Sequence, residues 1–387
     1  MLVTSNRTRI KEYLDYLKKE IDLLAPLLSP HRKVVQMHWG GGTPTYLEPE
    51  EISDLATFIR RHFSFSLDAE VSVEIDPRGL TIDHLKALRG AGFNRVSIGL
   101  QDFDPKVQQI VNRIQHEEVT RQTIAWCRSL GFDSINIDLI YGLPLQTVES
   151  FEQTLNKIIG LSPNRLAVYN FAYVPWMRPH QKLIHPEDLP SPDAKIKILT
   201  MTIEKFTEAG YEYIGMDHFA KPEDELTLSQ KNKTLHRNFQ GYSTKAGCDL
   251  FGFGMSAISH FSTFYAQNSR TLPEYYTAIE GGRFATHVGY RMTADDEIRK
   301  LVIMQLMCDL ELKKADVEKK FNIDFDDYFE SSLANLTSLV EDGLVIDTPD
   351  SLTVTTRGRL FLRNIAMCFD AYLPQAQKEK PLFSRTV

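Results

Sequence analysis

Cysteine is scarce in this sequence of 387 residues: there are four, and no two lie closer than 60 positions. Metal-ligating cysteines and disulfide frameworks both use short, regular spacings, so neither kind of site is indicated. Cys127, Cys308 and Cys368 fall within apolar, helix-like patterns, which favours buried structural thiols. Cys248 lies in a glycine-containing loop and is open to either interpretation.

Long apolar runs, dense basic runs and a leader pattern are also missing. No apolar run approaches the ~20 residues that a membrane-spanning helix needs. Residues 1–7 have neither the apolar core nor the small-residue cleavage site of a signal peptide. The net charge of −7 and the lack of a Lys/Arg run argue against nucleic-acid binding, and local arginines would have to hold an acidic substrate. We therefore expect a cytoplasmic protein with no membrane span and no nucleic-acid partner.

The most informative stretch runs from Val34 to Tyr46, where the pattern of a buried strand ends in Gly40-Gly41-Gly42. Adjacent glycines are expected where the backbone turns sharply or lies directly against a ligand. The stretch has neither Gly-Lys-Ser/Thr nor the spaced glycines of nucleotide-binding loops. A helix with acidic residues near its start follows, and strand, glycine turn and helix are typical of a ligand-binding corner in α/β proteins. A tight surface turn is the other interpretation.

Strand and helix patterns alternate at intervals of roughly 30 residues, which is the rhythm of a parallel sheet with right-handed crossovers. The expected strands are Val34–Trp39, Glu70–Asp76, Arg95–Gln101, Ser134–Ile140 and Arg165–Asn170. The expected helices surround Ile10–Leu24, Ile52–Ile59, Leu85–Leu88, Val107–Ile110, Glu117–Leu130 and Val148–Ile159. So many successive units favour a barrel or part-barrel over an open sheet.

The rhythm breaks after Pro175. The remaining chain predicts a helix over 196–206, one strand over Tyr211–Phe219, a loop over Lys221–Lys233, helices at Asp295–Cys308, Lys313–Phe321 and Asp326–Glu341, strands at Leu344–Asp347 and Ser351–Val354, and a final helix at Thr356–Phe369. Helices followed by a small hairpin resemble a winged-helix module. Because this module is acidic or neutral, we interpret it as a structural element or a lid over the substrate and not as a DNA-binding domain. We expect two domains, an α/β part-barrel over 1–290 and a mostly helical, winged-helix-like domain over 291–387.

Polar residues recur where the predicted strands end, namely Thr43, Glu74, Gln101, Asp138 and Tyr169. The carboxyl ends of parallel strands meet at one rim, and this rim carries the active site of α/β barrels. A single polar residue there is usually a solvated edge position, but their recurrence on successive strands predicts a shared site.

Histidines offer a different chemistry for the same rim: His38, His218, His236 and His260 could meet there as metal ligands of a barrel hydrolase. None of them has a tight ligand spacing, and single histidines are more often structural. No serine or cysteine nucleophile elbow is present. A metal hydrolase remains an alternative to be tested.

Taken together, blocks along essentially the whole chain resemble one family. The blocks are Trp39–Thr45, Glu74–Pro77, Gly99–Phe103, Val111–Arg113, Asp138–Pro144, Met216–Phe219, His236–Tyr242, Gly254–Ser259 and Phe383–Arg385. They resemble the oxygen-independent coproporphyrinogen III oxidases, which are radical S-adenosylmethionine (SAM) enzymes of haem biosynthesis. Asp217-His218 and the block Asn238–Tyr242 favour the true oxidase over its relatives.

The resemblance implies a radical SAM part-barrel in which a 4Fe-4S cluster reduces SAM to a 5′-deoxyadenosyl radical. The radical takes a hydrogen atom from the β-carbon of a substrate propionate, and loss of CO₂ and one electron leaves a vinyl group. Two such events convert coproporphyrinogen III to protoporphyrinogen IX. The resemblance also implies a monomer that works with an electron donor and an electron acceptor.

The resemblance further assigns residues to SAM. Gly42 and Thr43 would approach its methionine end, and the Arg113 guanidinium would hold its carboxylate. The remaining assignments are acceptors for its amino and hydroxyl groups (Glu74, Gln101 and Asp138) and walls of the adenine pocket (Ala172 and Ile258). The catalytic residues and the ligands of the substrate carboxylates are not assigned.

The sequence departs from the family at one point. The family holds its cluster with Cys-x₃-Cys-x₂-Cys after the first barrel strand, and no such spacing occurs here. We expect that strand and its loop to lie ahead of Thr4. We also expect a chain without them to be inactive. The strand that begins at Val34 would then have an exposed edge. A cluster-free descendant, acting as a haem- or porphyrin-binding carrier, is the alternative; the SAM residues above argue against it.

Overall fold

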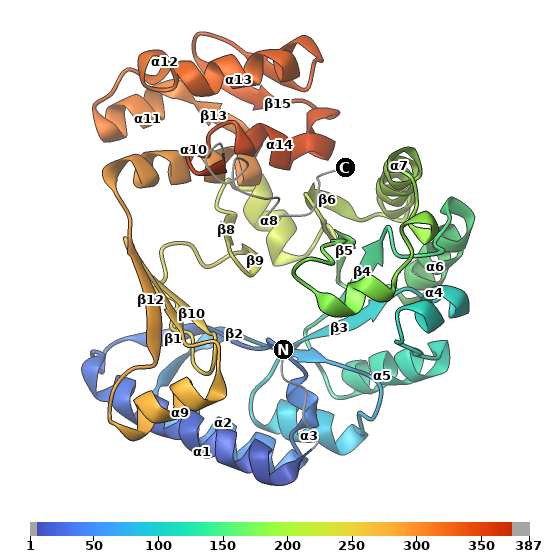
Figure 1. The fold of residues 1–387 in the computed structure, drawn as a ribbon, viewed down its shortest axis with the longest axis vertical. Helices are drawn as coiled ribbons and strands as arrows, with labels where there is room; N and C mark the ends of the chain where they lie inside the picture. The colour runs from blue at the N-terminus through green and yellow to red at the C-terminus, as the bar shows by residue number, and fades with distance from the viewer. Residues whose placement is uncertain (1–5, 374–387) are drawn as a thin grey trace. The chain divides into compact units, whose positions relative to one another are not determined.

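The computed structural model describes residues 6–373 of the chain (Figure 1). They include a seven-stranded sheet in the order β1-β2-β3-β4-β5-β7-β6. The chain divides into two units. The first unit is Met1–Leu100, Gln115–Ile137 and Gly247–Met292, and the second unit is Gln101–Ile114, Asp138–Ala246 and Thr293–Val387.

The first unit alternates strands with helices and ends in an antiparallel sheet. Its elements are α1 (Arg7–Leu24), β1 (Lys33–Trp39), α2 (Pro49–His62), β2 (Ser64–Ile75), α3 (Ile82–Gly90), β3 (Arg95–Gln101, whose last residue opens the second unit), α5 (Glu117–Ser129), the start of β4 (Ser134–Tyr141), β10 (Ile258–Phe261), β11 (Phe264–Asn268), α9 (Leu272–Glu280) and β12 (Thr286–Arg291). The pairs β1–β2 and β2–β3 are parallel, which confirms the predicted parallel sheet.

Local sequence explains where α1 begins and ends. The Asn6 side chain caps it by accepting from the backbone N–H groups of Thr8 and Arg9. Ile10, Leu14 and Ile21 recur on one buried face. The helix stops before Pro26, which cannot donate the next helical hydrogen bond. Figure 1 shows α1 packed between α2 and α9.

The prediction that β1 is a buried strand was wrong. None of its residues is buried, because β1 lies at one edge of the described sheet and pairs only with β2. Its exposed edge agrees with the expectation for this strand. The glycines at its end therefore reflect the turn that follows rather than a core position.

The second unit contains the rest of the sheet and all elements after residue 292. They are α4 (Pro105–Ile110), the end of β4, α6 (Val148–Leu161), β5 (Arg165–Asn170), α7 (Pro192–Glu208), β6 (Glu212–Gly215), β7 (His218–Ala220), α8 (Glu225–Lys231), β8 (His236–Asn238), β9 (Gly241–Ser243), α10 (Ala294–Asp309), β13 (Glu311–Lys313), α11 (Lys314–Phe321), α12 (Phe325–Tyr328), α13 (Glu330–Glu341), β14 (Val345–Asp347), β15 (Ser351–Val354) and α14 (Leu362–Met367).

Two predictions for the segment Asp138–Ala246 of this unit were wrong. The expected single strand over Tyr211–Phe219 is the hairpin β6–β7, because Met216 turns the chain with a φ of +51°. The expected loop over Lys221–Lys233 contains α8, which Asp224 caps by accepting from the Leu226 N–H. β7 pairs antiparallel with β5, so the parallel rhythm ends there.

The C-terminal elements share one core and keep the predicted order of helices before a hairpin. Phe325, Phe329 and Phe369 are fully buried in that core. The expected helix Asp326–Glu341 is two helices, α12 and α13, and β13 was not expected. The expected final helix Thr356–Phe369 is a 3₁₀ turn, Gly358–Phe361, followed by α14. The division into domains 1–290 and 291–387 stays a prediction.

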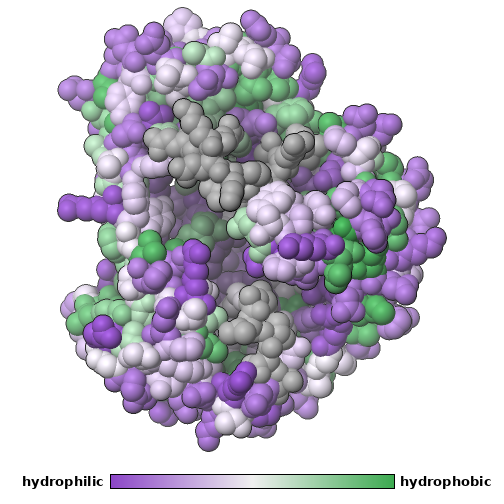
Figure 2. Space-filling model, viewed as in Figure 1, coloured by the Kyte–Doolittle hydropathy of each residue, from purple (hydrophilic) through white to green (hydrophobic). Residues whose placement is uncertain are grey.

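The described helices include none that is long and apolar enough to cross a membrane. The face drawn in Figure 2 is mostly hydrophilic, with hydrophobic side chains in separate groups. Cys127 and Cys308 are buried as predicted, and burial raises the pKa of the Cys127 thiol to about 12. Cys368 is only half-buried, contrary to prediction, and Cys248 is exposed.

Candidate active site

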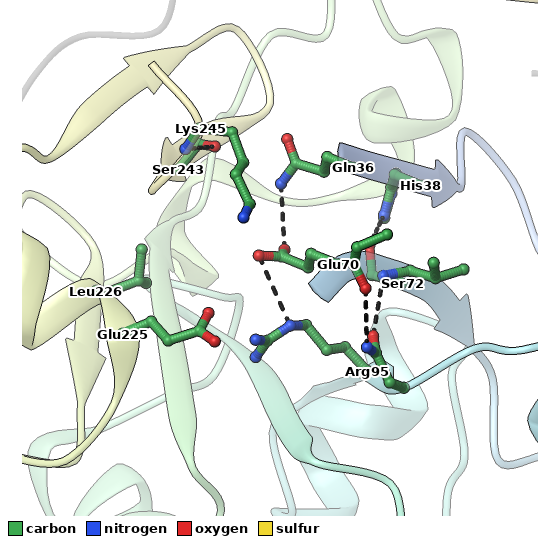
Figure 3. Close-up of polar contacts among 12 residues, drawn as sticks. Gln36, His38, Glu70, Ser72, Arg95, Glu225, Leu226, Ser243 and Lys245 are labelled. Atoms are coloured by element: carbon green, nitrogen blue, oxygen red, sulfur yellow. Dashed lines mark hydrogen bonds and ion pairs between the residues drawn. The ribbon is translucent and has the colours of Figure 1, made fainter. Parts of the chain in front are cut away.

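A row of polar side chains occupies one face of the strands in the first unit. On β2 this row is Glu70, Ser72 and Glu74, which share a face because successive side chains alternate. Gln36 Nε2 donates to Glu70 Oε1 at 3.2 Å, and Arg95 Nε lies 3.6 Å from Glu70 Oε2 (Figure 3). The Arg95 and Glu70 side chains are only 12% and 11% exposed, so loss of either would leave a buried charge.

The same face continues on the neighbouring strands. His38 Nδ1 lies 2.8 Å from Ser72 Oγ, and His38 Nε2 lies 3.4 Å from Glu74 Oε1. Asn136 Nδ2 on β4 donates to Ser97 Oγ on β3 at 2.9 Å. This sheet face is therefore lined by groups that can donate and accept hydrogen bonds.

The glycine turn after β1 lies against this face. A Cβ atom on Gly40 would be 2.5 Å from His38 Nε2 and 2.7 Å from Glu74 Oε1, so a larger residue there would displace the ends of these two side chains. Gly41 has a φ of +81°, the left-handed conformation that glycine adopts without strain. A Cβ on Gly41 or Gly42 would meet no described atom within 4 Å. This open space is what the predicted approach of a ligand to Gly42 requires.

Thr43 leads from the glycine turn into α2. Its carbonyl accepts from the Tyr46 N–H at 3.0 Å, which closes a 3₁₀ turn over Pro44–Tyr46. Glu51 then accepts from the Glu48 N–H at 2.9 Å as part of a capping box. The expected helix with acidic residues at its positive end is thus confirmed.

Asp102 is a buried carboxylate directly after Gln101 in the second unit. It is 1% exposed and accepts hydrogen bonds from Thr154 Oγ1 at 2.5 Å, Gln146 Nε2 at 2.6 Å and the Asp104 N–H at 2.9 Å. Burial raises the pKa of Asp102, and these hydrogen bonds oppose the rise. Gln101 itself has a φ of +76°, a strained conformation of the kind that clusters at functional sites.

The Asp102 network orients two loops. Gln146 Oε1 accepts from the Gly142 N–H at 2.6 Å and so holds the loop after β4. Gln108 Nε2 donates to the Asp102 carbonyl at 2.8 Å, and the Arg113 N–H donates to the Gln108 carbonyl at 2.8 Å. Asp102 therefore helps to position Arg113 without itself being one of the predicted site residues.

The structure places the eight predicted site residues in both units. Gly42, Thr43, Glu74 and Ile258 belong to the first unit, and Gln101, Arg113, Asp138 and Ala172 belong to the second. Gln101 ends β3, and Asp138 lies in the C-terminal half of β4, three residues before its last residue Tyr141. Ala172 lies beyond β5 with its carbonyl accepting from Gln181 Nε2 at 2.9 Å, and Ile258 opens β10.

Comparison with known proteins decides the family. Residues 4–158 match the radical SAM superfamily, and residues 292–361 match the HemN C-terminal domain. The chain is 47% identical over 386 residues to the oxygen-independent coproporphyrinogen III oxidase of Escherichia coli (strain K12), which covers 100% of this chain and 84% of that protein. The enzyme of the same name from Synechocystis sp. is 46% identical over 390 residues, with the same coverage.

This chain belongs to the oxygen-independent coproporphyrinogen III oxidase family. The solved structure of coproporphyrinogen III oxidase (HemN) from Escherichia coli, described as a radical SAM enzyme, matches with a TM-score of 0.93 and 47% identity over 96% of this chain and 85% of that one. The predicted fold, a radical SAM part-barrel with a helical C-terminal portion, is confirmed.

Enzymes of the radical SAM superfamily use SAM and a 4Fe-4S cluster. The residues present fit SAM, because open space lies beside Gly41 and Gly42 next to a polar sheet face. They do not fit the cluster: among residues 6–373, no three His, Cys, Asp or Glu side chains are grouped to hold a metal ion. The same finding contradicts the hypothesis that His38, His218, His236 and His260 form the metal site of a hydrolase. The His260 ring, for example, stacks on the Tyr265 ring.

Some residues around the site were not predicted from the sequence. Gln36, Glu70 and Arg95 form a buried network, and a signal for it existed in the alternation of polar and apolar residues along β1, β2 and β3. Asp102 and Gln146 gave no such signal, because their contacts join segments 44 positions apart.

Proposed function

We propose that this chain binds SAM and coproporphyrinogen III and catalyses the oxidative decarboxylation of two propionates to vinyls, giving protoporphyrinogen IX. The 47% identity to the Escherichia coli enzyme across the whole of this chain carries the proposal. Each conversion removes one hydrogen atom from the β-carbon, one CO₂ and one electron from a propionate. An electron donor and an electron acceptor are therefore required as partners.

We assign the SAM contacts to the residues that the resemblance selects. Gly42 and Thr43 offer an open backbone to the methionine end, and Arg113 offers a planar fork for its carboxylate. The acceptors are Glu74, Gln101 and Asp138, and the adenine walls are Ala172 and Ile258. SAM and the cluster together supply the radical in this family, and this chain's described residues supply the binding and orientation of SAM.

We further propose a monomeric protein of the cytoplasm with domains 1–290 and 291–387. A haem- or porphyrin-binding carrier is the second candidate function. A carrier has little use for SAM, so the two functions differ in whether SAM binds.

Calorimetric titration with SAM tests the proposal without requiring a cluster. We expect SAM to bind, and Arg113→Ala to weaken binding about tenfold or more, because the carboxylate loses a bidentate charged partner. Arg121→Ala, which removes an arginine paired with Glu117 on exposed α5 surface, is the matched control and should leave the affinity unchanged.

Turnover is the second readout. The protein is reconstituted anaerobically with iron, sulfide, reductant and SAM, incubated with coproporphyrinogen III, and its porphyrins are separated after oxidation. Protoporphyrin and 5′-deoxyadenosine would support the enzyme. Haem binding that SAM does not alter, with no SAM affinity, would support the carrier.

A further inference from the structure

The turn between β6 and β7 brings a carboxylate close to an imidazole and a guanidinium in the second unit. Asp217 lies in the turn, His218 opens β7, and Arg237 lies on β8. The turn is held by two hydrogen bonds, from Tyr213 Oη to the Met216 carbonyl at 2.9 Å and from the Val168 N–H to the Asp217 carbonyl at 2.7 Å. Its backbone is therefore fixed while the Asp217 side chain remains available.

The polar atoms of this cluster lack hydrogen-bond partners within the described part of the chain. The Asp217 side chain is 16% exposed, yet its nearest cation is Arg363 Nη2 at 3.7 Å, and no donor there reaches its carboxylate within hydrogen-bonding distance. His218 Nδ1 and Arg237 Nε are buried and also have no hydrogen-bond partner. Buried polar groups are almost always hydrogen-bonded, so two such exceptions beside a half-buried carboxylate call for a ligand.

Another aspartate in the same unit shows what a structural carboxylate looks like here. Asp224 has a side chain 6% exposed and accepts from Arg165 Nε at 2.8 and 2.9 Å and from the Leu226 N–H at 2.9 Å. The fold thus supplies Asp224 with hydrogen bonds, whereas Asp217 has only its long ion pair with Arg363. Burial raises the pKa of Asp217, and the positive charges of Arg363 and Arg237 oppose this rise. Such a rise is expected for a carboxylate that accepts no hydrogen bond.

Aromatic side chains surround this cluster. The His218 ring meets the rings of Tyr169 and Tyr242 edge-on, with centroids 6.0 and 5.3 Å apart. The Arg237 guanidinium lies 5.6 Å from the Tyr242 ring centre. The Tyr242 hydroxyl already donates to the Met307 carbonyl at 2.9 Å, so it does not satisfy Asp217 or Arg237. The surroundings therefore suit a ligand with electron-rich aromatic rings that carries both N–H donors and a carboxylate.

We propose that Asp217 accepts hydrogen bonds from the pyrrole N–H groups of the tetrapyrrole substrate, and that Arg237 binds the carboxylate of one of its propionates. This inference rests on the proposed function. A porphyrinogen presents an N–H donor on every pyrrole and no ring acceptor, and an ionised carboxylate is an acceptor only. Arg237 offers the forked donor geometry that a carboxylate prefers.

The chemistry predicts selection for the reduced ring. In the oxidised porphyrin, half of the ring nitrogens have lost their hydrogen and present lone pairs, which would repel the Asp217 carboxylate. The propionates are the same in both rings. Asp217 therefore distinguishes coproporphyrinogen III from coproporphyrin III, whereas Arg237 does not.

The test is anaerobic equilibrium dialysis of coproporphyrinogen III and coproporphyrin III against the full chain, with bound ligand measured as fluorescent porphyrin after oxidation. We expect Asp217→Asn to weaken porphyrinogen binding about tenfold or more and to leave porphyrin binding unchanged or stronger. Arg237→Gln should weaken both ligands by similar factors. Glu223→Gln, which removes an exposed carboxylate from the loop after β7, is the matched control and should change neither.

Thermal unfolding separates this role from a structural one. Asp217→Asn removes a poorly solvated charge that nothing pairs within hydrogen-bonding distance, so its unfolding temperature should equal or exceed that of the wild type. Equal weakening of both rings, unchanged porphyrinogen binding, or a lower unfolding temperature would overturn the proposal. SAM affinity should be unchanged in Asp217→Asn. A wild-type chain that binds SAM but no porphyrinogen overturns this inference alone, whereas one without SAM affinity overturns the proposed function.

Discussion

Glu20 shows how a single side chain can join distant segments of the first unit. It is 4% exposed on α1 and accepts from the Gly254 N–H at 2.7 Å, Asn268 Nδ2 at 2.6 Å and Tyr275 Oη at 2.8 Å. Burial raises the pKa of Glu20, and these donors oppose the rise. The loop at Gly254, the strand β11 and the helix α9 therefore all depend on one carboxylate.

We expect Glu20→Ala to lower the free energy of unfolding by about 3 kcal/mol, because it leaves buried donors without an acceptor. Glu20→Gln keeps one acceptor oxygen, so its free energy of unfolding should lie between those of the wild type and Glu20→Ala. Urea denaturation measures both, with exposed Glu12→Ala on the same helix as the control. A loss no larger than that of Glu12→Ala would show that solvent replaces the missing acceptor.

His218 predicts a pH dependence of stability. Burial, with a smaller effect of Arg237, lowers the pKa of His218 to about 3, against about 6.5 in an unfolded chain. The folded state keeps the ring neutral while the unfolded state takes up a proton below pH 6.5. The stabilisation is thus present above pH 6.5 and is lost as the pH falls towards 3.

His218→Asn should flatten this profile. Because the ring is partly open to solvent, we expect the wild type to lose about 1 kcal/mol more than the variant between pH 7.5 and pH 5. Urea denaturation at both pH values checks this, and His180→Asn on the exposed 3₁₀ turn Pro179–Leu183 is the control. Identical losses in wild type and His218→Asn would contradict the assignment.

Among the elements, the glycine turn after β1 separates stability from ligand binding. Gly41 has a φ of +81°, so Gly41→Ala should cost about 1 kcal/mol of unfolding free energy. Gly42→Ala faces open space and should leave the unfolding temperature unchanged while it weakens SAM binding. Calorimetric scans and SAM titrations check both variants. Unchanged SAM affinity in Gly42→Ala would place the ligand elsewhere.

The C-terminal module has its own sensitive turn. A Cβ on Gly358 would lie 1.9 Å from the Leu344 carbonyl oxygen and 3.1 Å from Val354 Cγ1. The first contact is with backbone, so we expect Gly358→Ala to cost about 3 kcal/mol or more. Gly160→Ala, which meets no described atom within 4 Å on α6, is the control and should be neutral or slightly stabilising. Equal unfolding temperatures for both variants would refute the clash.

At the scale of the whole molecule, the charge predicts how the winged-helix-like module behaves. The chain carries a net charge of −7, and phosphate contacts need clustered Lys and Arg. We expect no retention of duplex DNA in gel-shift assays at 50 mM salt. DNA binding that weakens steeply as the salt concentration rises would contradict this prediction and show that the module binds nucleic acid.

Much of the α/β region could be predicted from sequence because its signals are local. The helix period of 3.6 and the strand period of 2 place α1, β3, α5 and β5 within a few residues. The helix α8 was missed because it has few apolar residues and depends on Asp224, which pairs with Arg165 far away in the sequence. The antiparallel strands β10, β11 and β12 were also missed, since their stability lies in pairing with one another.

The sequence by itself determined the family, the strand-and-helix order and the residues expected to meet SAM. The sequence could determine these features because turn glycines, strand ends and motif blocks each consist of residues that are neighbours in the chain. Only the tertiary structure decided that β1 is an edge strand, that Asp102 is satisfied by Thr154 and Gln146, and that Asp217 has one long ion pair, with Arg363, and no hydrogen-bond donor within the described residues. Burial and partnership depend on groups far apart in the chain, and the positions of such groups exist only once the fold has formed.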